Sequence, residues 1–342
     1  MQTTQDARED LFKGKKILYV HGFASSGASG TVKSLRLLLP SATIIAPDLP
    51  IHPREALDLL TETIRNERPS LVIGTSMGGM LSQMLYGVDR ILVNPAFEIA
   101  DTFLKRDMLG KVTFHNPRKD GVQEFMLTKS LVQEFREVSR MCFMEKQQDK
   151  DCHVYGLFGL HDDVVDTYDL FHSHYANAIR FDGGHYLNDH TIIHSLLPVI
   201  QWIDDDQEGR HRPVILTDLE DVVAVTCGEP FKEESPEIAT SVFALHQLSR
   251  TYDVHIVGEL DDTCFLEASA KVSWCSQHLG VAFWNRLTLT KDKSVLLADY
   301  FITKAGREHL LEDFMGSTIP LGSDTYKSWE DILGYFCLLG GQ

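Results

Sequence analysis

Residues 70–86 read SLVIGTSMGGMLSQMLY, in which a short apolar run, a glycine-rich turn and a helical pattern follow one another. The apolar run predicts a buried strand, and the segment after Gly79 predicts a helix. The turn, Gly74-Thr-Ser-Met-Gly78, has the G-x-S-x-G pattern, whose small residues let the backbone bend sharply and expose the serine oxygen. Ser76 is therefore the candidate nucleophile.

Further apolar runs flank this turn and alternate with helical patterns. Val, Ile and Leu dominate the runs, which lack the alternation of a half-exposed sheet. Strands that alternate with helices predict a parallel sheet covered by helices on both faces. The expected strands are residues 15–20, 42–48, 70–74, 90–95, 153–159 and 178–182, and the expected helices are residues 31–39, 54–66 and 80–86.

The interval 97–151 interrupts this alternation. It contains no convincing strand, only a helix-like stretch of mixed charge at residues 127–138. An insertion of this length within an α/β sheet is typical of a cap or lid. The sequence therefore predicts a helical cap insertion that shapes the substrate pocket.

A polar, charged segment at residues 203–213 predicts a linker between two domains. It contains Gly209 and Pro213 and separates two regions of apolar periodicity. Strands are expected beyond it at residues 214–219, 253–258 and 294–299. The predicted domains are residues 1–208 and a second, smaller α/β domain at residues 209–342.

The composition excludes several classes of protein. The 342 residues carry 32 Lys and Arg against 49 Asp and Glu, for a formal net charge of −17. Such a chain lacks the cationic surface that nucleic acids require and gains nothing from an anionic membrane, so neither partner is expected. No apolar stretch reaches the roughly 18 to 20 residues that span a bilayer. The 43% hydrophobic and 24% charged fractions are those of a globular protein.

The chain is expected to be cytoplasmic. The first ten residues, MQTTQDARED, are polar and acidic and lack the basic and apolar regions of a signal peptide. The cysteines are scattered without any C-x-x-C pair, and in a long chain with no export signal we expect reduced structural thiols rather than disulfides. The six cysteines are Cys142, Cys152, Cys227, Cys264, Cys275 and Cys337.

Two further residues could complete a catalytic triad with Ser76. A serine hydroxyl needs a histidine to take its proton and a carboxylate to orient that histidine. Asp162 follows the predicted strand 153–159 and is preferred to the adjacent Asp163 because its spacing from Gly159 is G-x-x-D. His185 follows two glycines after the next predicted strand, which gives the chain order Ser, Asp, His.

Backbone N–H groups are expected to bind the oxyanion. One belongs to Met77, the residue after the nucleophile, and the other to Phe23, in the loop after the first strand. His190 and His194 share one helical face but have no third ligand nearby, so no metal site is expected.

Residues 14–203 resemble the YqiA-like bacterial esterases, a family within the α/β-hydrolases. The resemblance rests on YVHGFASSGASGTVKSL, VIGTSMGG, ILVNPAF, GLHDDVV and GGH. It implies Ser76, Asp162 and His185 as the triad and a small acyl ester as substrate, with no cofactor.

The segment that begins at Val214, VILTDLEDVV, resembles the first motif of haloacid-dehalogenase-like (HAD-like) phosphatases. Over about 120 residues the pattern is similar to the 5′(3′)-deoxyribonucleotidase branch of that superfamily. The resemblance places Asp218 at the nucleophile and Lys293 at the lysine that balances the phosphate charge. It also implies a Mg²⁺ ion in an active member.

The departures from that family are substantial. Glu220 stands where the family has the acid/base Asp, Asp221 replaces a Gly, and Gly258 replaces a Thr or Ser. Thr303 and Lys304 replace the paired carboxylates that bind the metal, and a lysine there repels a divalent cation. We therefore expect this second domain to be inactive.

The predicted fold class is α/β, with an α/β-hydrolase domain followed by a smaller Rossmann-like, HAD-type domain. The leading functional hypothesis is a serine esterase that cleaves small acyl esters or thioesters. One alternative is a Mg²⁺-dependent nucleotidase or phosphatase in the second domain. Another alternative treats that domain as an interaction or dimerisation module, in which case the chain would form a homo-oligomer.

Overall fold

The described part of the chain forms two compact units. The computed structural model describes residues 8, 10–227, 229–260 and 265–340, so Cys264 lies outside the described residues. The units are Met1–Glu208 and Gly209–Gln342, and their boundary falls inside the polar segment 203–213. Across the described ranges, no helix combines the length and the apolar character needed to cross a membrane.

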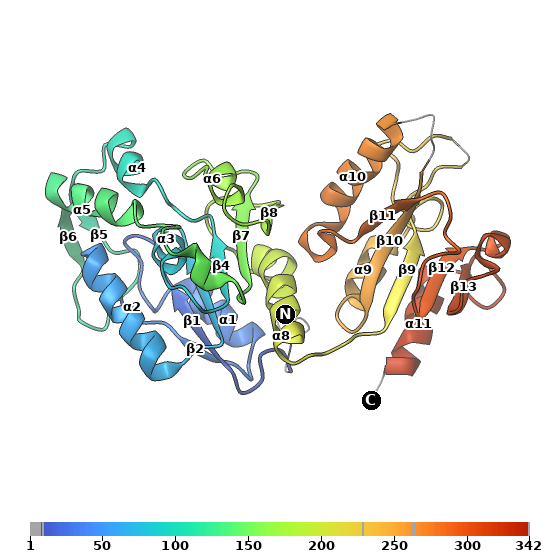
Figure 1. Cartoon of the computed structure of the whole chain (residues 1–342), viewed down its shortest axis with the longest axis horizontal. Helices are drawn as coiled ribbons and strands as arrows, with labels where there is room; N and C mark the ends of the chain where they lie inside the picture. The colour runs from blue at the N-terminus through green and yellow to red at the C-terminus, as the bar shows by residue number, and fades with distance from the viewer. Residues whose placement is uncertain (1–7, 9, 228, 261–264, 341–342) are drawn as a thin grey trace. The chain divides into compact units, whose positions relative to one another are not determined.

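A six-stranded parallel sheet forms the centre of the first unit (Figure 1). Its strand order is β2-β1-β3-β4-β7-β8, which confirms the expected parallel sheet. Every strand predicted for this unit is present. The bounds are β1 Lys16–Val20, β2 Thr43–Ile45, β3 Leu71–Thr75, β4 Arg90–Val93, β7 Val154–Gly159 and β8 Ala178–Phe181.

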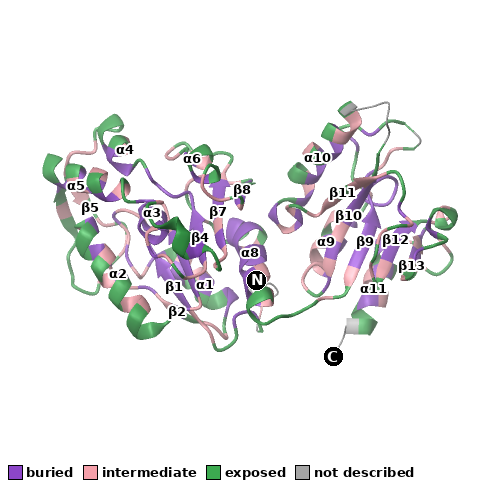
Figure 2. Cartoon of the chain, viewed as in Figure 1, coloured by how far each residue is buried: buried purple, intermediate pink, exposed green. Residues whose placement is uncertain are grey.

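Helices cover this sheet and leave their outer sides exposed (Figure 2). Leu18 and Val20 pack on one face with Leu60 and Leu81, and the alternate strand residues point to the other face. The helices are α1 Gly30–Leu38, α2 Pro53–Glu67, α3 Met77–Gln83, α6 Tyr168–His172, α7 Asp189–Thr191 and α8 Leu197–Gln207, with a π-helical turn at Ile192–Leu196. Because all six strands of this sheet are parallel, their carboxyl ends meet at one edge of the sheet.

The insertion between β4 and β7 is not purely helical, so that prediction was wrong. It contains α4 Ile99–Lys105, α5 Lys129–Ser139, a 3-10 turn at Lys146–Asp149 and an antiparallel pair, β5 Gly110–Thr113 with β6 Glu124–Leu127. These strands have four residues each, and β5 alternates between half-buried and exposed positions. So short and polar a strand leaves almost no hydrophobic pattern in the sequence.

A buried ion pair joins the end of the insertion to the sheet. Arg90 begins β4, and its Nη1 and Nη2 lie 2.9 Å and 2.5 Å from Oδ1 and Oδ2 of Asp149. Both side chains are almost fully buried. The Tyr175 hydroxyl also donates to Asp149, at 2.6 Å, so three segments converge on one carboxylate.

The second unit has a five-stranded parallel sheet in the order β11-β10-β9-β12-β13. Its strands are β9 Val214–Asp218, β10 Asp253–Glu259, β11 Leu287–Thr290, β12 Tyr300–Lys304 and β13 Ser317–Leu321. The strand predicted at residues 294–299 is wrong, because that segment is a loop in which Val295 and Leu297 are exposed. The apolar run there ends just before the buried strand β12.

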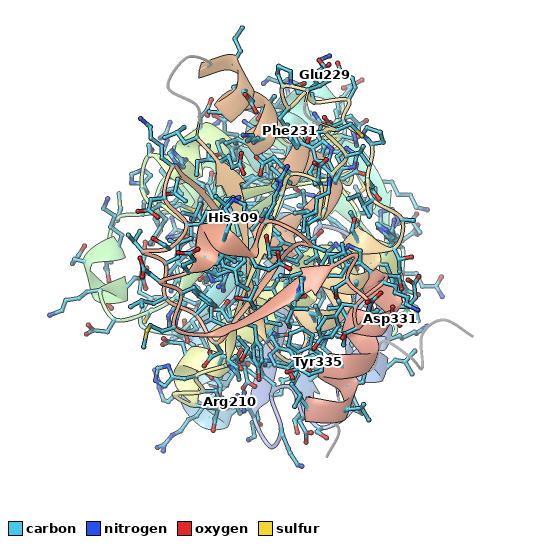
Figure 3. The ribbon with its side chains drawn as sticks, turned by 90° about the vertical axis from the view of Figure 1, so that its right-hand side faces the viewer. Arg210, Glu229, Phe231, His309, Asp331 and Tyr335 are labelled. Atoms are coloured by element: carbon cyan, nitrogen blue, oxygen red, sulfur yellow. The ribbon has the colours of Figure 1, made fainter. Side chains whose placement is uncertain are left out.

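In the part of the second unit that the structure describes, the helices beside this sheet are α9 Ser241–Leu248, α10 Phe265–Leu279 and α11 Trp329–Gly340, together with 3-10 turns at Val281–Phe283 and Glu308–Leu311. Trp274 and Trp329 are the largest fully buried side chains of this core. Asp331 and Tyr335 project from α11 (Figure 3), and the Tyr335 ring packs 5.2 Å from that of Phe336. The sheet therefore has its own hydrophobic core.

Candidate active site

Ser76 lies on a tight turn between β3 and α3. Its φ is +54°, a positive value that is unusual for a residue with a side chain and typical of strained functional turns. The turn needs glycine at Gly78, because a Cβ there would overlap the carbonyl oxygen of Val20. The predicted sharp turn between strand and helix, the serine elbow, is therefore present, with Ser76 directly after the carboxyl end of β3.

The three predicted triad residues form one hydrogen-bonded chain. His185 Nε2 lies 3.0 Å from Ser76 Oγ, and His185 Nδ1 lies 2.8 Å from Asp162 Oδ2. The side chains of His185 and Asp162 are 7% and 2% exposed, so little water competes for these contacts. Three segments separated by up to 109 positions in sequence thus meet at one point.

Asp162 is fixed through its second oxygen. The backbone N–H groups of Val164 and Val165 donate to Oδ1 at 2.7 Å and 2.9 Å. Burial raises the pKa of Asp162, but the hydrogen bonds from His185 and these amides outweigh it, so the pKa lies below its ordinary value. The alternative, Asp163, is 85% exposed and lies 3.7 Å from Arg106. The geometry therefore places Asp162 rather than Asp163 beside His185.

Asn94, which the sequence analysis did not single out, forms hydrogen bonds to the loop after β8 that carries His185. Its amide Nδ2 donates to the carbonyls of Gly184 and His185 at 3.0 Å and 3.2 Å. Its Oδ1 accepts from the backbone of Gly159 at 2.8 Å. Asn94 thus ties the ends of β4 and β7 to the loop after β8. A polar residue directly after the buried strand β4 is the signal that could have identified it.

His21 orients the loop that carries Phe23. Its Nδ1 lies 2.9 Å from the Gly22 carbonyl oxygen, and its Nε2 accepts from the Leu49 N–H at 3.1 Å. The neutral tautomer with the proton on Nδ1 satisfies both contacts. Because an amide N–H points opposite to the carbonyl of the same peptide, fixing the Gly22 carbonyl also fixes the direction of the Phe23 N–H.

This arrangement predicts a pH-dependent stability. Burial lowers the pKa of His21 below its ordinary value of about 6.5, so below that pH the unfolded chain binds a proton that the folded chain resists. We expect the free energy of unfolding to fall as the pH drops below neutral. His21→Asn should flatten that slope and cost about 1–3 kcal/mol at neutral pH, because the Leu49 N–H loses its acceptor.

Chemical denaturation at neutral and mildly acidic pH measures this effect. His52→Asn is the matched control, since Glu134 raises the pKa of the largely exposed His52. Any stability from that pair is present at acidic pH and lost as the pH rises, so the control should change the slope weakly and in the opposite direction. An unchanged acid slope in the His21 variant would contradict the prediction.

A cavity of about 740 Å³ opens at Ser76. Gly22 and Phe23 of the loop after β1 line it, together with His185. The insertion contributes Ile99, Phe103, Met108, His115 and Asn116. This volume lies within the range of small-molecule sites.

The second unit also gathers charged residues at the carboxyl ends of its strands. Lys293 Nζ lies 2.6 Å from Asp218 Oδ1, and the Thr303 hydroxyl donates to Asp218 Oδ2 at 2.6 Å. Lys293 also reaches Glu259 at 3.1 Å. Burial lowers the pKa of Lys293, but these carboxylates outweigh it and keep the pKa above its ordinary value. Both oxygens of Asp218 therefore have partners within the chain.

The other predicted positions are paired as well. Glu220 lies 2.8 Å from Lys271, which the sequence analysis did not identify. Lys304 and Arg307 lie 3.1 Å and 3.2 Å from Asp221 Oδ2. Each of the carboxylates Asp218, Glu220 and Asp221 thus lies beside a lysine or arginine side chain.

This donor set does not fit Mg²⁺. The ion prefers an octahedron of oxygen ligands, whereas Asp218 and Asp221 face ammonium and guanidinium groups. Among all described residues, no group of three or more His, Cys, Asp or Glu is arranged to hold a metal. The rings of His190 and His194 lie 4.4 Å apart, and they too lack such a group.

A protein-family model described as Uncharacterised protein family (UPF0227) matches residues 16–202, more than half of the chain. The chain belongs to this family. The UPF0227 match covers β1 through most of α8 and includes the three residues of the hydrogen-bonded chain. This UPF0227 unit has an α/β-hydrolase-like fold, because its parallel sheet carries the serine elbow directly after β3.

Solved structures are also similar to this UPF0227 chain. Est1E from Butyrivibrio proteoclasticus is 16% identical, covering 60% of this chain and 91% of that chain, with a TM-score of 0.39. A thioesterase domain from the curacin biosynthetic pathway is 16% identical (55% and 90% covered, TM-score 0.35). Tomato methylketone synthase I complexed with 2-tridecanone is 10% identical (58% and 99%, TM-score 0.37). A search of curated proteins found no match.

Proposed function

We propose that the first unit is a cytoplasmic serine hydrolase that cleaves carboxylic esters or thioesters without a cofactor. The observation that carries this proposal is the hydrogen-bonded chain from Ser76 through His185 to Asp162. Such a chain activates a serine that is otherwise a weak nucleophile. The strained backbone at Ser76 and the cavity above it support the same reaction.

In this mechanism Ser76 Oγ attacks the acyl carbon while His185 Nε2 takes the hydroxyl proton. Asp162 accepts from His185 Nδ1 and stabilises the imidazolium that forms. The N–H groups of Phe23 and Met77 bind the oxyanion. Met77 opens α3, and the first N–H groups of a helix have no acceptor within that helix. His185 then returns the proton to the leaving group, and water releases the acyl group by the same steps.

The test is hydrolysis of p-nitrophenyl esters from acetate to decanoate by the full chain. We expect turnover that does not respond to Mg²⁺ or to a chelator. The dependence on chain length would measure how much of the cavity the acyl group fills. Turnover that disappears with the chelator would contradict a metal-free serine mechanism.

For the second unit we propose a phosphatase-like (HAD-like) fold that no longer transfers phosphoryl groups. The hydrogen bond from the Thr303 hydroxyl to Asp218 Oδ2 supports this proposal, because Thr303 stands where the resemblance would place a metal-binding carboxylate. Lys304 beside Asp221 adds positive charge where a metal would have to sit.

Adding Mg²⁺ is therefore expected to have no effect on this unit. Millimolar Mg²⁺ should produce no hydrolysis of nucleoside monophosphates and no shift in thermal unfolding, because a ligand stabilises a protein only by binding its folded state. The measurements are phosphate release and a thermal scan with and without the ion. A Mg²⁺-dependent release of phosphate that Asp218→Asn abolishes would overturn the proposal.

A further inference from the structure

The cavity at Ser76 has two sides of different chemistry, and the strand order explains why. Ser76 follows β3, which lies between β1 and β4. Segments that follow β1 therefore lie on one side of the nucleophile, and segments that follow β4 and β7 lie on the other. The two sides differ in composition, although each also receives residues from elsewhere in the chain: Phe23 follows β1, and Asn116 belongs to the insertion after β4.

The side toward β4 and β7 is apolar. It is lined by Ala96, Ile99, Phe103, Val164 and Val165, and the Phe23 ring joins it by packing 4.5 Å from the Phe103 ring. The one guanidinium among the lining residues described, that of Arg106, donates to the Asp163 carbonyl. This side therefore suits an aliphatic chain.

The side toward β1 is rich in hydroxyl and amide groups. Its lining includes four hydroxyl residues that follow β1: Ser25, Ser29, Thr31 and Ser34. Asn116 of the insertion and the segment of Asn188 and Asp189 after β8 join this side through hydrogen bonds to Ser25 and Ser34. Asn116 Nδ2 donates to Ser25 Oγ at 3.1 Å, and Ser34 Oγ donates to Asp189 Oδ1 at 2.5 Å. Asp189 places a carboxylate on this side, which disfavours an anionic group there.

The proton path decides which part of the substrate lies on the hydroxyl-rich side. His185 must return its proton to the leaving oxygen, so the leaving group lies next to the loop that carries His185. That loop continues through Tyr186 to Asp189 along the cavity wall, and Asp189 bonds to Ser34 on α1. The leaving group therefore faces the hydroxyl-rich side, and the acyl chain faces the apolar side.

We propose that the natural substrates are esters of a neutral, hydroxyl-rich alcohol, such as glycerol or a sugar, with an aliphatic acid. This inference rests on the proposed serine hydrolase function and specifies its leaving group. The hydroxyl and amide groups of the cavity bind the alcohol, while the carboxylate of Asp189 disfavours phosphorylated carriers.

The test compares glyceryl monobutyrate with propyl butyrate, which share the acyl group and differ only in two hydroxyls of a three-carbon alcohol. We expect kcat/KM to be about tenfold higher for the glyceryl ester. Thr31→Val and Ser34→Ala should each lower that ratio by about three- to tenfold, the effect of losing one hydrogen bond between neutral groups. Thr102→Val makes the same change as Thr31→Val on the apolar side and should leave the ratio unchanged.

The outcomes separate the two proposals. Ester hydrolysis that persists in Ser76→Ala would overturn the serine mechanism itself. Serine-dependent hydrolysis with a ratio near one, or with a preference for butyryl-coenzyme A and its anionic carrier, would overturn only the hydroxyl-rich alcohol. A ratio that falls equally in the Thr31 and Thr102 variants would also overturn it, because the two sides would then be equivalent.

Discussion

Ser76→Ala is expected to lower kcat for ester hydrolysis by about 10⁴-fold or more while the chain stays folded. The alanine side chain removes the nucleophilic oxygen, and residual turnover can come only from oxyanion binding and substrate positioning. The loss should appear in kcat for every ester of the p-nitrophenyl series, because the same oxygen attacks each acyl carbon. Steady-state turnover, with thermal unfolding measured in parallel, checks the prediction.

Ser82, on the helix α3 that follows Ser76, offers a matched control. Among the described residues its buried hydroxyl has no hydrogen-bond partner, and it takes no part in the Ser76–His185 contact. Ser82→Ala is the same chemical change and should leave turnover within about twofold, as expected for a group outside the reaction. Ser76→Ala protein that retains more than about one hundredth of the turnover would contradict the mechanism.

Asp149→Ala is expected to destabilise the first unit by about 3–5 kcal/mol. The substitution leaves the guanidinium of Arg90 buried without its carboxylate, and an uncompensated buried charge is far more costly than a lost surface pair. The Tyr175 hydroxyl loses its acceptor as well. The free energy of unfolding from urea titration, followed by a signal from the first unit, measures the loss.

Asp163→Ala is the control for removal of one negative charge. Its side chain is 85% exposed and lies 3.7 Å from Arg106, so the loss should stay below about 1 kcal/mol. If Asp149→Ala and Asp163→Ala lowered the free energy of unfolding equally, burial would not explain how much the Arg90–Asp149 pair contributes to stability.

The serine elbow and its partners could be predicted because their signals are local. Gly74, Ser76 and Gly78 lie within one turn, and the parallel topology alone requires that the ends of β3, β7 and β8 meet at one edge. The preference for Asp162 over Asp163 rested on spacing, and the structure places Asp162 beside His185.

The residues that prediction missed depend on contacts between distant segments. The position of Asn94 directly after β4 marks it as a polar residue at a strand end, but no local pattern shows that it contacts backbone atoms 65, 90 and 91 positions away. Lys271 is an ordinary residue of a helical pattern until folding brings it to Glu220. The prediction of a strand at residues 294–299 was wrong because it relied on a local apolar run alone. Hydrophobic residues do not by themselves show which segment the sheet buries.

The order of the two units along the chain has a consequence during synthesis. Every strand of the first sheet lies before residue 209, so the whole of that sheet leaves the ribosome before the second. Residues 209–342 amount to 342 − 208 = 134 residues, which take about 7–27 s at roughly 5–20 residues per second. The parallel sheet around Ser76, whose pairings are all non-local and slow to form, thus has many seconds to fold before the competing strands of the second unit are complete.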